Sequence, residues 1–89
     1  MAKAYVKLPV GMTTAGGERQ IACEAATVAQ ALDLAIVAEP RLKPRVFRED
    51  GRMWAGVFLN ARNINALGGL DTPLKDDDVL SVVPPISGG

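Results

Sequence analysis

Apolar and polar residues alternate in two segments near the start of the chain. Residues 5–8 (Tyr-Val-Lys-Leu) alternate until the Pro-Val-Gly of residues 9–11 breaks the pattern, which predicts a strand over residues 3–8. Residues 13–17 (Thr-Thr-Ala-Gly-Gly) have the composition of a turn, and residues 18–24 alternate again. Two alternating segments joined by a turn predict a β-hairpin.

A helix is predicted over residues 28–38. Thr27 and Gln30 have the spacing of a capping box, in which each side chain bonds the free backbone N–H of the other residue at a helix start. Pro40 prevents the helix from continuing. One helical face is apolar and predicts the side that packs on a sheet: Val28, Leu32, Ala35 and Ile36.

The segment that follows the helix is polar. Residues 41–52 are predicted to form a loop or an irregular hairpin around Val46 and Phe47, with a turn at residues 49–51 (Glu-Asp-Gly). Residues 54–59 are rich in apolar and aromatic residues and predict a strand.

Three further elements are predicted toward the end of the chain. Ile64 is placed on a short strand, and residues 67–74 on a tight turn with one turn of 3₁₀ helix. Residues 76–78 are three aspartates that read as a solvated turn, because their spacing lacks the ligand pattern of a calcium loop. The last strand then runs over residues 79–83.

Strands on both sides of one helix predict a single α+β roll. The domain is expected to span residues 1–84. Residues 85–89 follow a Pro-Pro break and have no apolar alternation left to pair with a strand, so they are expected to form a flexible tail that projects from the domain.

Composition and charge exclude several classes of function. The 89 residues carry ten basic and ten acidic side chains, so the chain lacks the basic excess that is typical of nucleic-acid binders. The longest apolar stretch, residues 31–38, is too short to cross a membrane, and the N-terminus has no secretory pattern. A cytoplasmic protein that is monomeric alone is expected.

Candidate chemistry within the domain is sparse. The chain has one cysteine and no histidine, so we expect no metal site, no cofactor and no internal disulfide. Cys23 lies on the same side of its strand as Ile21 and is interpreted as a small buried thiol. Nothing in the sequence pairs a nucleophile with a base, so a catalytic site is not expected either.

The C-terminal Gly88-Gly89 is the candidate reactive segment of this chain. Five residues from Pro85 onward extend roughly 17 Å, enough to carry a carboxylate into a deep active site. Glycines at the last two positions remove side chains that would obstruct a narrow channel. A terminal carboxylate is ionised at neutral pH and is a poor electrophile, so it needs activation, for example as an acyl-adenylate.

The sequence also resembles a known family. Residues 76–89 closely resemble the C-terminus of the MoaD, ThiS and ubiquitin superfamily. Residues 57–60 (Val-Phe-Leu-Asn), then Ile64, then residues 68–70 (Gly-Gly-Leu) occur in the order and approximate spacing of that family. The resemblance implies a ubiquitin-like β-grasp fold, a mixed sheet of about four to five strands packed on one main helix.

The resemblance implies a function as a sulfur carrier without a catalytic site of its own. In the family, an E1-like enzyme of the MoeB or ThiF type adenylates the terminal glycine, here Gly89. Sulfur then replaces the adenylate, and the thiocarboxylate passes sulfur to an acceptor such as a synthase subunit of the MoaE type. The acceptor could belong to molybdopterin, thiamin-type thiazole, cysteine or thio-nucleoside synthesis, and tail composition favours the molybdopterin branch. A ubiquitin-like modifier joined through Gly89 to lysines and a purely structural β-grasp module are the alternatives.

A docking surface is predicted beside the base of the tail. Strand alternation sends Phe58 and Val83 to the face away from the helix, where an exposed apolar pair suits a partner protein. The alternative is that a loop residue such as Trp54 covers them. Three tail residues complete the predicted partner-binding set: Pro85, Ile86 and Ser87.

Overall fold

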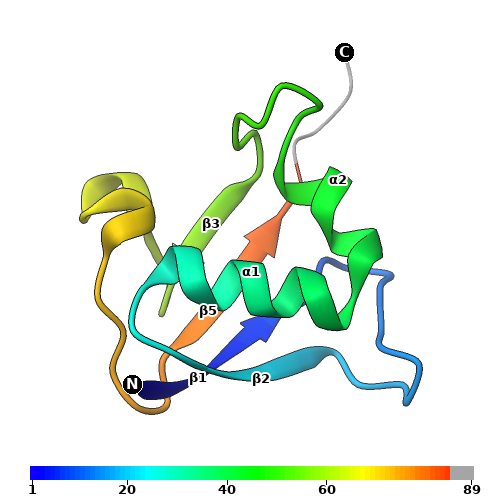
Figure 1. The fold of residues 1–89 in the computed structure, drawn as a ribbon, viewed down its shortest axis with the longest axis horizontal. Coiled ribbons are helices and arrows are strands. Elements are labelled where there is room, and N and C mark those ends of the chain that lie inside the picture. Colours follow the sequence, from blue (N-terminus) through cyan, green and yellow to red (C-terminus); the bar gives the residue numbers. More distant parts are fainter. Residues whose placement is uncertain (85–89) are drawn as a thin grey trace.

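The computed structural model describes residues 1–84. Its sheet strands and main helix are β1 (Ala2–Lys7), β2 (Gln20–Ala25), α1 (Val28–Ala38), β3 (Gly56–Leu59), β4 (Arg62–Asn63) and β5 (Val79–Val83). The strands form one sheet in the order β2-β1-β5-β3-β4, and α1 crosses one of its faces (Figure 1). This two-layer arrangement is the predicted α+β roll.

The sheet is mixed because its two halves meet in a parallel pair. β1 pairs antiparallel with β2 and parallel with β5, while β3 pairs antiparallel with β5 and β4. β5 therefore lies at the centre, between the N-terminal hairpin and the β3–β4 hairpin (Figure 1). β5 is paired on both sides over residues 79–81, and its last residues, Val82 and Val83, pair with β3 alone.

Helix α1 has the bounds that the sequence predicts. The Oγ1 atom of Thr27 accepts a hydrogen bond from the backbone N of Gln30 at 3.3 Å, as expected for the cap. The reciprocal bond differs, because the Gln30 amide oxygen accepts from the backbone N of Ala26 at 2.8 Å and not from that of Thr27. Both bonds still satisfy free N–H groups at the helix start.

The core lies between α1 and the inner face of the sheet. Val28, Leu32 and Ala35 of the helix are fully buried, and Ile36 packs against the core at its margin. Alternate residues of the central strands complete this layer: Val6, Val57, Leu80 and Val82. The predicted apolar face of the helix is thus confirmed.

The prediction of a loop over residues 41–52 is wrong in its first half. A 3₁₀ turn, Pro40–Leu42, continues into the short helix α2, Lys43–Val46. Each of these elements has a proline in its first turn, where the missing N–H costs nothing, so the prolines that end α1 also start the next helices. The second half is the irregular hairpin, closed by a bridge between Phe47 and Met53.

The β3–β4 hairpin also differs from the prediction. Strand β3 begins at Gly56 rather than Trp54, and Ile64 starts a 3₁₀ turn, Ile64–Ala66, instead of lying on a strand. The Asn63 side chain accepts from the backbone N of Asn65 and caps that turn at 2.9 Å. Ile64 is fully buried, so its apolar character reflects the core and not strand formation.

The remaining segments within residues 1–84 agree with the sequence. A 3₁₀ turn covers Gly69–Asp71. The three aspartates form the turn before β5, in which Asp76 accepts from the backbone N of Lys3 at 2.9 Å and Asp78 from that of Lys75 at 2.8 Å. The Asp76 carboxylate therefore fastens this turn to the start of β1, and the Asp78 carboxylate closes the turn itself.

Candidate functional site

The face of the sheet opposite α1 carries the predicted docking residues. In β5, Leu80 and Val82 point into the core, so Ser81 and Val83 point to the opposite face, and Val83 is 50% exposed. In β3 the same alternation places Phe58 on that face, where it is half-buried. The structure therefore brings Phe58 and Val83 onto one surface, as the sequence predicts.

The register of β3 and β5 fixes how these two residues lie. Phe58 is opposite Ser81, and Gly56 is opposite Val83. A Cβ atom built on Gly56 would lie 3.2 Å from Cε1 of Phe58, so the ring leans along β3 toward Gly56. Because cross-strand partners are close neighbours, this brings the ring toward Val83.

Two further apolar residues extend this surface. Tyr5 of β1 is opposite Val79 of β5, and both are half-buried on the outer face. The exposed Lys7 is opposite Ser81 and borders the same strip. We refer to Tyr5, Phe58, Val79 and Val83 as the outer apolar strip. Tyr5 and Val79 are not among the docking residues predicted from the sequence, although their alternation with Val6 and Leu80 places them on this face.

Trp54 has a different environment from the one considered in the sequence. Its Nε1 donates a hydrogen bond to the backbone oxygen of Pro44 at 3.2 Å, and the residue is 49% exposed. Its backbone N donates to the oxygen of Val46 at 2.9 Å. Trp54 thus ties the segment that precedes β3 to α2.

The described chain reaches Pro84, one residue beyond the end of β5. The other predicted site residues, Gly88 and Gly89 together with Pro85, Ile86 and Ser87, lie outside the described residues. Val83 is the last residue of β5 and belongs to the outer apolar strip, so the described chain ends at the edge of this surface.

The titratable groups of the described part give no sign of a reactive centre. The Cys23 thiol lies 3.6 Å from the backbone oxygen of Ala31 and is buried. Burial raises the pKa of this thiol, which disfavours the thiolate and fits a packing role. Within residues 1–84, no group of three or more His, Cys, Asp or Glu residues is placed to hold a metal ion. No helix in this part of the chain is long and apolar enough to cross a membrane.

Comparisons with known proteins identify relatives over nearly the whole chain. The ThiS family model matches residues 11–89. A protein of Archaeoglobus fulgidus named as a candidate sulfur carrier is 29% identical over 86 residues, which cover 94% of this chain and 96% of the relative.

Two solved structures share the fold and match nearly the whole chain. The solution structure of small archaeal modifier protein 1 from Methanosarcina acetivorans is similar with a TM-score of 0.82 and 31% identity, covering 100% of this chain and 98% of the other. A chain of the Amycolatopsis orientalis BexX/CysO complex matches with a TM-score of 0.77 and 28% identity, covering 97% and 99%.

The relatives are small sulfur carriers and modifiers and not catalytic enzymes. Their fold agrees with the ubiquitin-like β-grasp fold inferred from the sequence. The family match covers far more than half of the residues. This chain therefore belongs to the ThiS family of ubiquitin-like sulfur carriers and small modifiers.

Proposed function

We propose that this protein is a sulfur carrier whose Gly89 carboxylate is adenylated by an E1-like enzyme and converted to a thiocarboxylate. The observation that carries the proposal is the outer apolar strip, which ends at Val83 immediately before the glycine-terminated segment. Membership of the ThiS family supports the same chemistry. Docking through the strip would leave the segment after Pro84 free to enter the partner's active site.

The proposed reaction has two steps. A carboxylate oxygen of Gly89 attacks the α-phosphorus of ATP and releases pyrophosphate, which forms an acyl-adenylate. A sulfide equivalent from a sulfur donor then attacks the carbonyl carbon and expels AMP, which leaves a thiocarboxylate. The partner supplies the nucleotide site, while this chain supplies the docking surface, the reach of the segment and the unhindered glycines.

Five residues form the proposed partner-binding set: Phe58, Val83, Pro85, Ile86 and Ser87. An E1-like enzyme of the MoeB or ThiF type binds them during activation. A sulfur-acceptor synthase subunit, of the MoaE type in the molybdopterin branch, binds them afterwards. The matched A. orientalis chain comes from a BexX/CysO complex, which supports hand-over within a complex of two proteins.

A second candidate function is conjugation to other proteins. Its support is the similarity to small archaeal modifier protein 1 at 31% identity and a TM-score of 0.82. Both functions begin with the same adenylate. They differ in the nucleophile that follows, which is sulfide for a carrier and a lysine amine for a modifier.

Intact-protein mass spectrometry tests the proposal. We expect incubation with an E1-like enzyme, ATP and a sulfur donor to replace one oxygen by one sulfur at Gly89, and a thiol-reactive reagent to label that sulfur. Cys23→Ala removes the competing thiol, and a chain without Gly88 and Gly89 is the negative control. An unchanged mass with every E1-like enzyme of the source genome would contradict sulfur carriage. Isopeptide bonds from Gly89 to lysines would establish modification.

A further inference from the structure

We infer that Gly56 is a positioning residue for the docking surface. Its missing side chain leaves room for the Phe58 ring beside Val83, and the ring in that position completes the surface that the activating enzyme binds. The effect on enzyme binding rests on the proposed function, whereas the position of the Phe58 ring beside Gly56 concerns the free protein alone.

The strand register supplies the first observation. Gly56 and Phe58 are successive outward positions of β3, and Gly56 lies directly opposite Val83 in β5. A side chain at residue 56 would therefore stand next to that of Val83. With glycine there, this place on the outer face is open to a neighbouring group.

The position of the Phe58 ring supplies the second observation. A Cβ atom on Gly56 would be 3.2 Å from Cε1 and 3.9 Å from Cζ of Phe58. Carbon atoms in favourable contact are separated by about 3.5–4.0 Å. Cε1 thus stands a few tenths of an ångström too close for a methyl group at residue 56, so the ring would have to shift by that much to make room for a side chain.

The backbone gives no other reason for glycine at this position. The φ angle of Gly56 does not lie in the left-handed region, in contrast to those of Gly11 and Gly51. Glycine inside a strand weakens the strand and commonly marks a close approach by another group. Here the approaching group is the Phe58 ring.

The consequence is a broader apolar surface at the end of β5. With its edge over Gly56, the ring lies toward Val83 instead of standing upright over Ser81. Aromatic anchors dominate many protein interfaces, and their contribution depends on how they fit the partner's pocket. A side chain at residue 56 would tilt the ring and change that fit without removing any apolar group.

Ring-current shifts in the free protein test the geometry. We expect the ring current of Phe58 to displace an Hα resonance of Gly56 from its usual position, and Phe58→Leu to abolish that displacement. The measurement uses only the parent chain and Phe58→Leu, so it is decisive even where a change at Gly56 destabilises the domain. A Gly56 shift that is the same in both proteins would overturn the inference, whatever the partner does.

Affinity for the E1-like adenylating enzyme of the source organism tests the consequence. We expect Gly56→Ala to weaken binding about five- to tenfold while the melting temperature stays within about 5 °C of the parent. Gly16→Ala is the matched control, since a Cβ there meets nothing nearer than 3.7 Å and the backbone needs no glycine. This control should bind like the parent.

A double mutant shows whether Gly56 acts through the ring. In the Phe58→Ala background, Gly56→Ala should change affinity less than twofold, because the group that it displaces is absent. A five- to tenfold loss in that background would overturn the positioning role. Unchanged affinity in both single mutants, with the ring-current shift present, would instead contradict docking through this face, which is a failure of the proposed function.

Discussion

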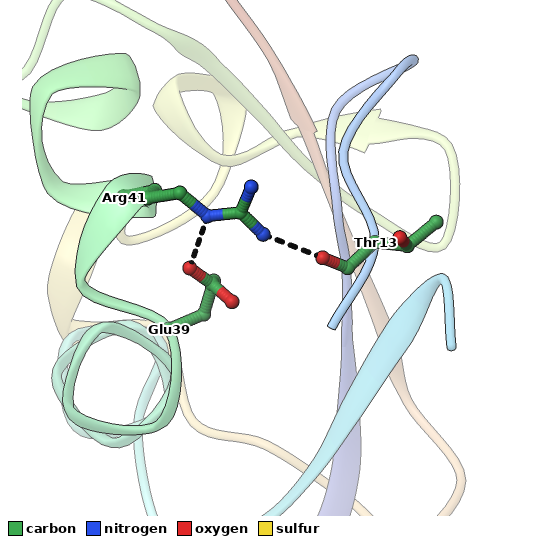
Figure 2. Close-up of polar contacts among 3 residues, drawn as sticks. All are labelled: Thr13, Glu39 and Arg41. Carbon is green, nitrogen blue, oxygen red and sulfur yellow. Dashed lines mark hydrogen bonds and ion pairs between the residues drawn. The ribbon is translucent and has the colours of Figure 1, made fainter. Parts of the chain in front are cut away.

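Glu39 and Arg41 form an ion pair in which the Glu39 Oε2 and Arg41 Nε atoms are 2.6 Å apart (Figure 2). Arg41 also donates from Nη2 to the backbone oxygen of Thr13 at 2.7 Å. The Glu39 side chain is 11% exposed and that of Arg41 is 64% exposed. This pair fastens the end of α1 to the loop between β1 and β2.

The ion pair predicts a pH-dependent contribution to stability. The hydrogen bond from Arg41 and its charge lower the pKa of Glu39 below the ordinary value. The folded state therefore favours the carboxylate, and its stabilisation is present above about pH 5 and is lost as the pH falls through the lowered pKa. Glu39→Gln should reduce the melting temperature at pH 7 and have little effect at about pH 2.

Melting curves of the parent and Glu39→Gln across this pH range check the prediction. The control is Asp50→Asn, which alters an exposed pair whose Arg52 Nε and Asp50 Oδ2 atoms are 3.9 Å apart. Exposed pairs at such distances contribute little to stability. If the melting temperatures of Glu39→Gln and the parent differ by the same amount at every pH, the charge of the Glu39 carboxylate does not contribute to stability.

Phe58→Asp should separate binding from folding. Loss of an aromatic anchor commonly costs an interface about 2 kcal/mol or more, which is about thirtyfold in affinity. The ring is half-buried on the outer face, so we expect a smaller loss of folding stability, about 1 kcal/mol. Calorimetric titration with the E1-like enzyme and parallel melting measure both. The exposed Gln20 lies on the same face at the β2 edge, and Gln20→Asp is the charge-matched control.

Val83→Asp tests the other end of the same surface. Like Phe58→Asp, it should weaken binding to the E1-like enzyme, because both side chains lie on the outer apolar strip. If one partner surface contacts both, the double mutant should lose less binding free energy than the sum of the single mutants. Strict additivity in a double-mutant cycle would place them in independent contacts.

Removal of Gly88 and Gly89 should abolish activation with little change in stability. The core residues of the described part of the chain run from Ala2 to Val82, and terminal residues commonly contribute few native contacts. Thermal melting and an ATP-dependent adenylation assay measure the two effects. A marked fall in melting temperature would contradict the prediction that this segment projects from the domain.

Ala61→Gly should stabilise the domain. Asn60 and Ala61 form the turn between β3 and β4 with φ angles of 49° and 76°, a conformation that costs a residue with a Cβ about 1 kcal/mol or more. Glycine adopts it freely but loses more entropy on folding, so we expect a net gain of about 0.5 kcal/mol. Denaturant unfolding measures this gain. Asn60 should not be replaced likewise, since its side chain bonds Asp78 at 2.8 Å and the backbone N of Val79 at 3.0 Å.

Local chemistry determined the helix and the last strand. Thr27 and Pro40 bound α1, and the aspartates and Pro84 bound β5, so the bounds could be predicted from a few adjacent residues. Alternation likewise determined the faces of Phe58 and Val83. The chemistry expected of Gly88 and Gly89 stays a prediction from the sequence, because it rests on residue type and position in the chain rather than on packing.

Tertiary structure decided where apolar residues find their partners. The local sequence predicts a strand at Ile64 and a loop or hairpin at Val46. Both residues instead lie in short helices, because their side chains are fully buried in the core there. The parallel pairing of β1 with β5 joins residues more than seventy positions apart, and no local pattern specifies it. That pairing unites Tyr5 and Val79 with Phe58 and Val83, so the docking surface as a whole exists only in the folded chain.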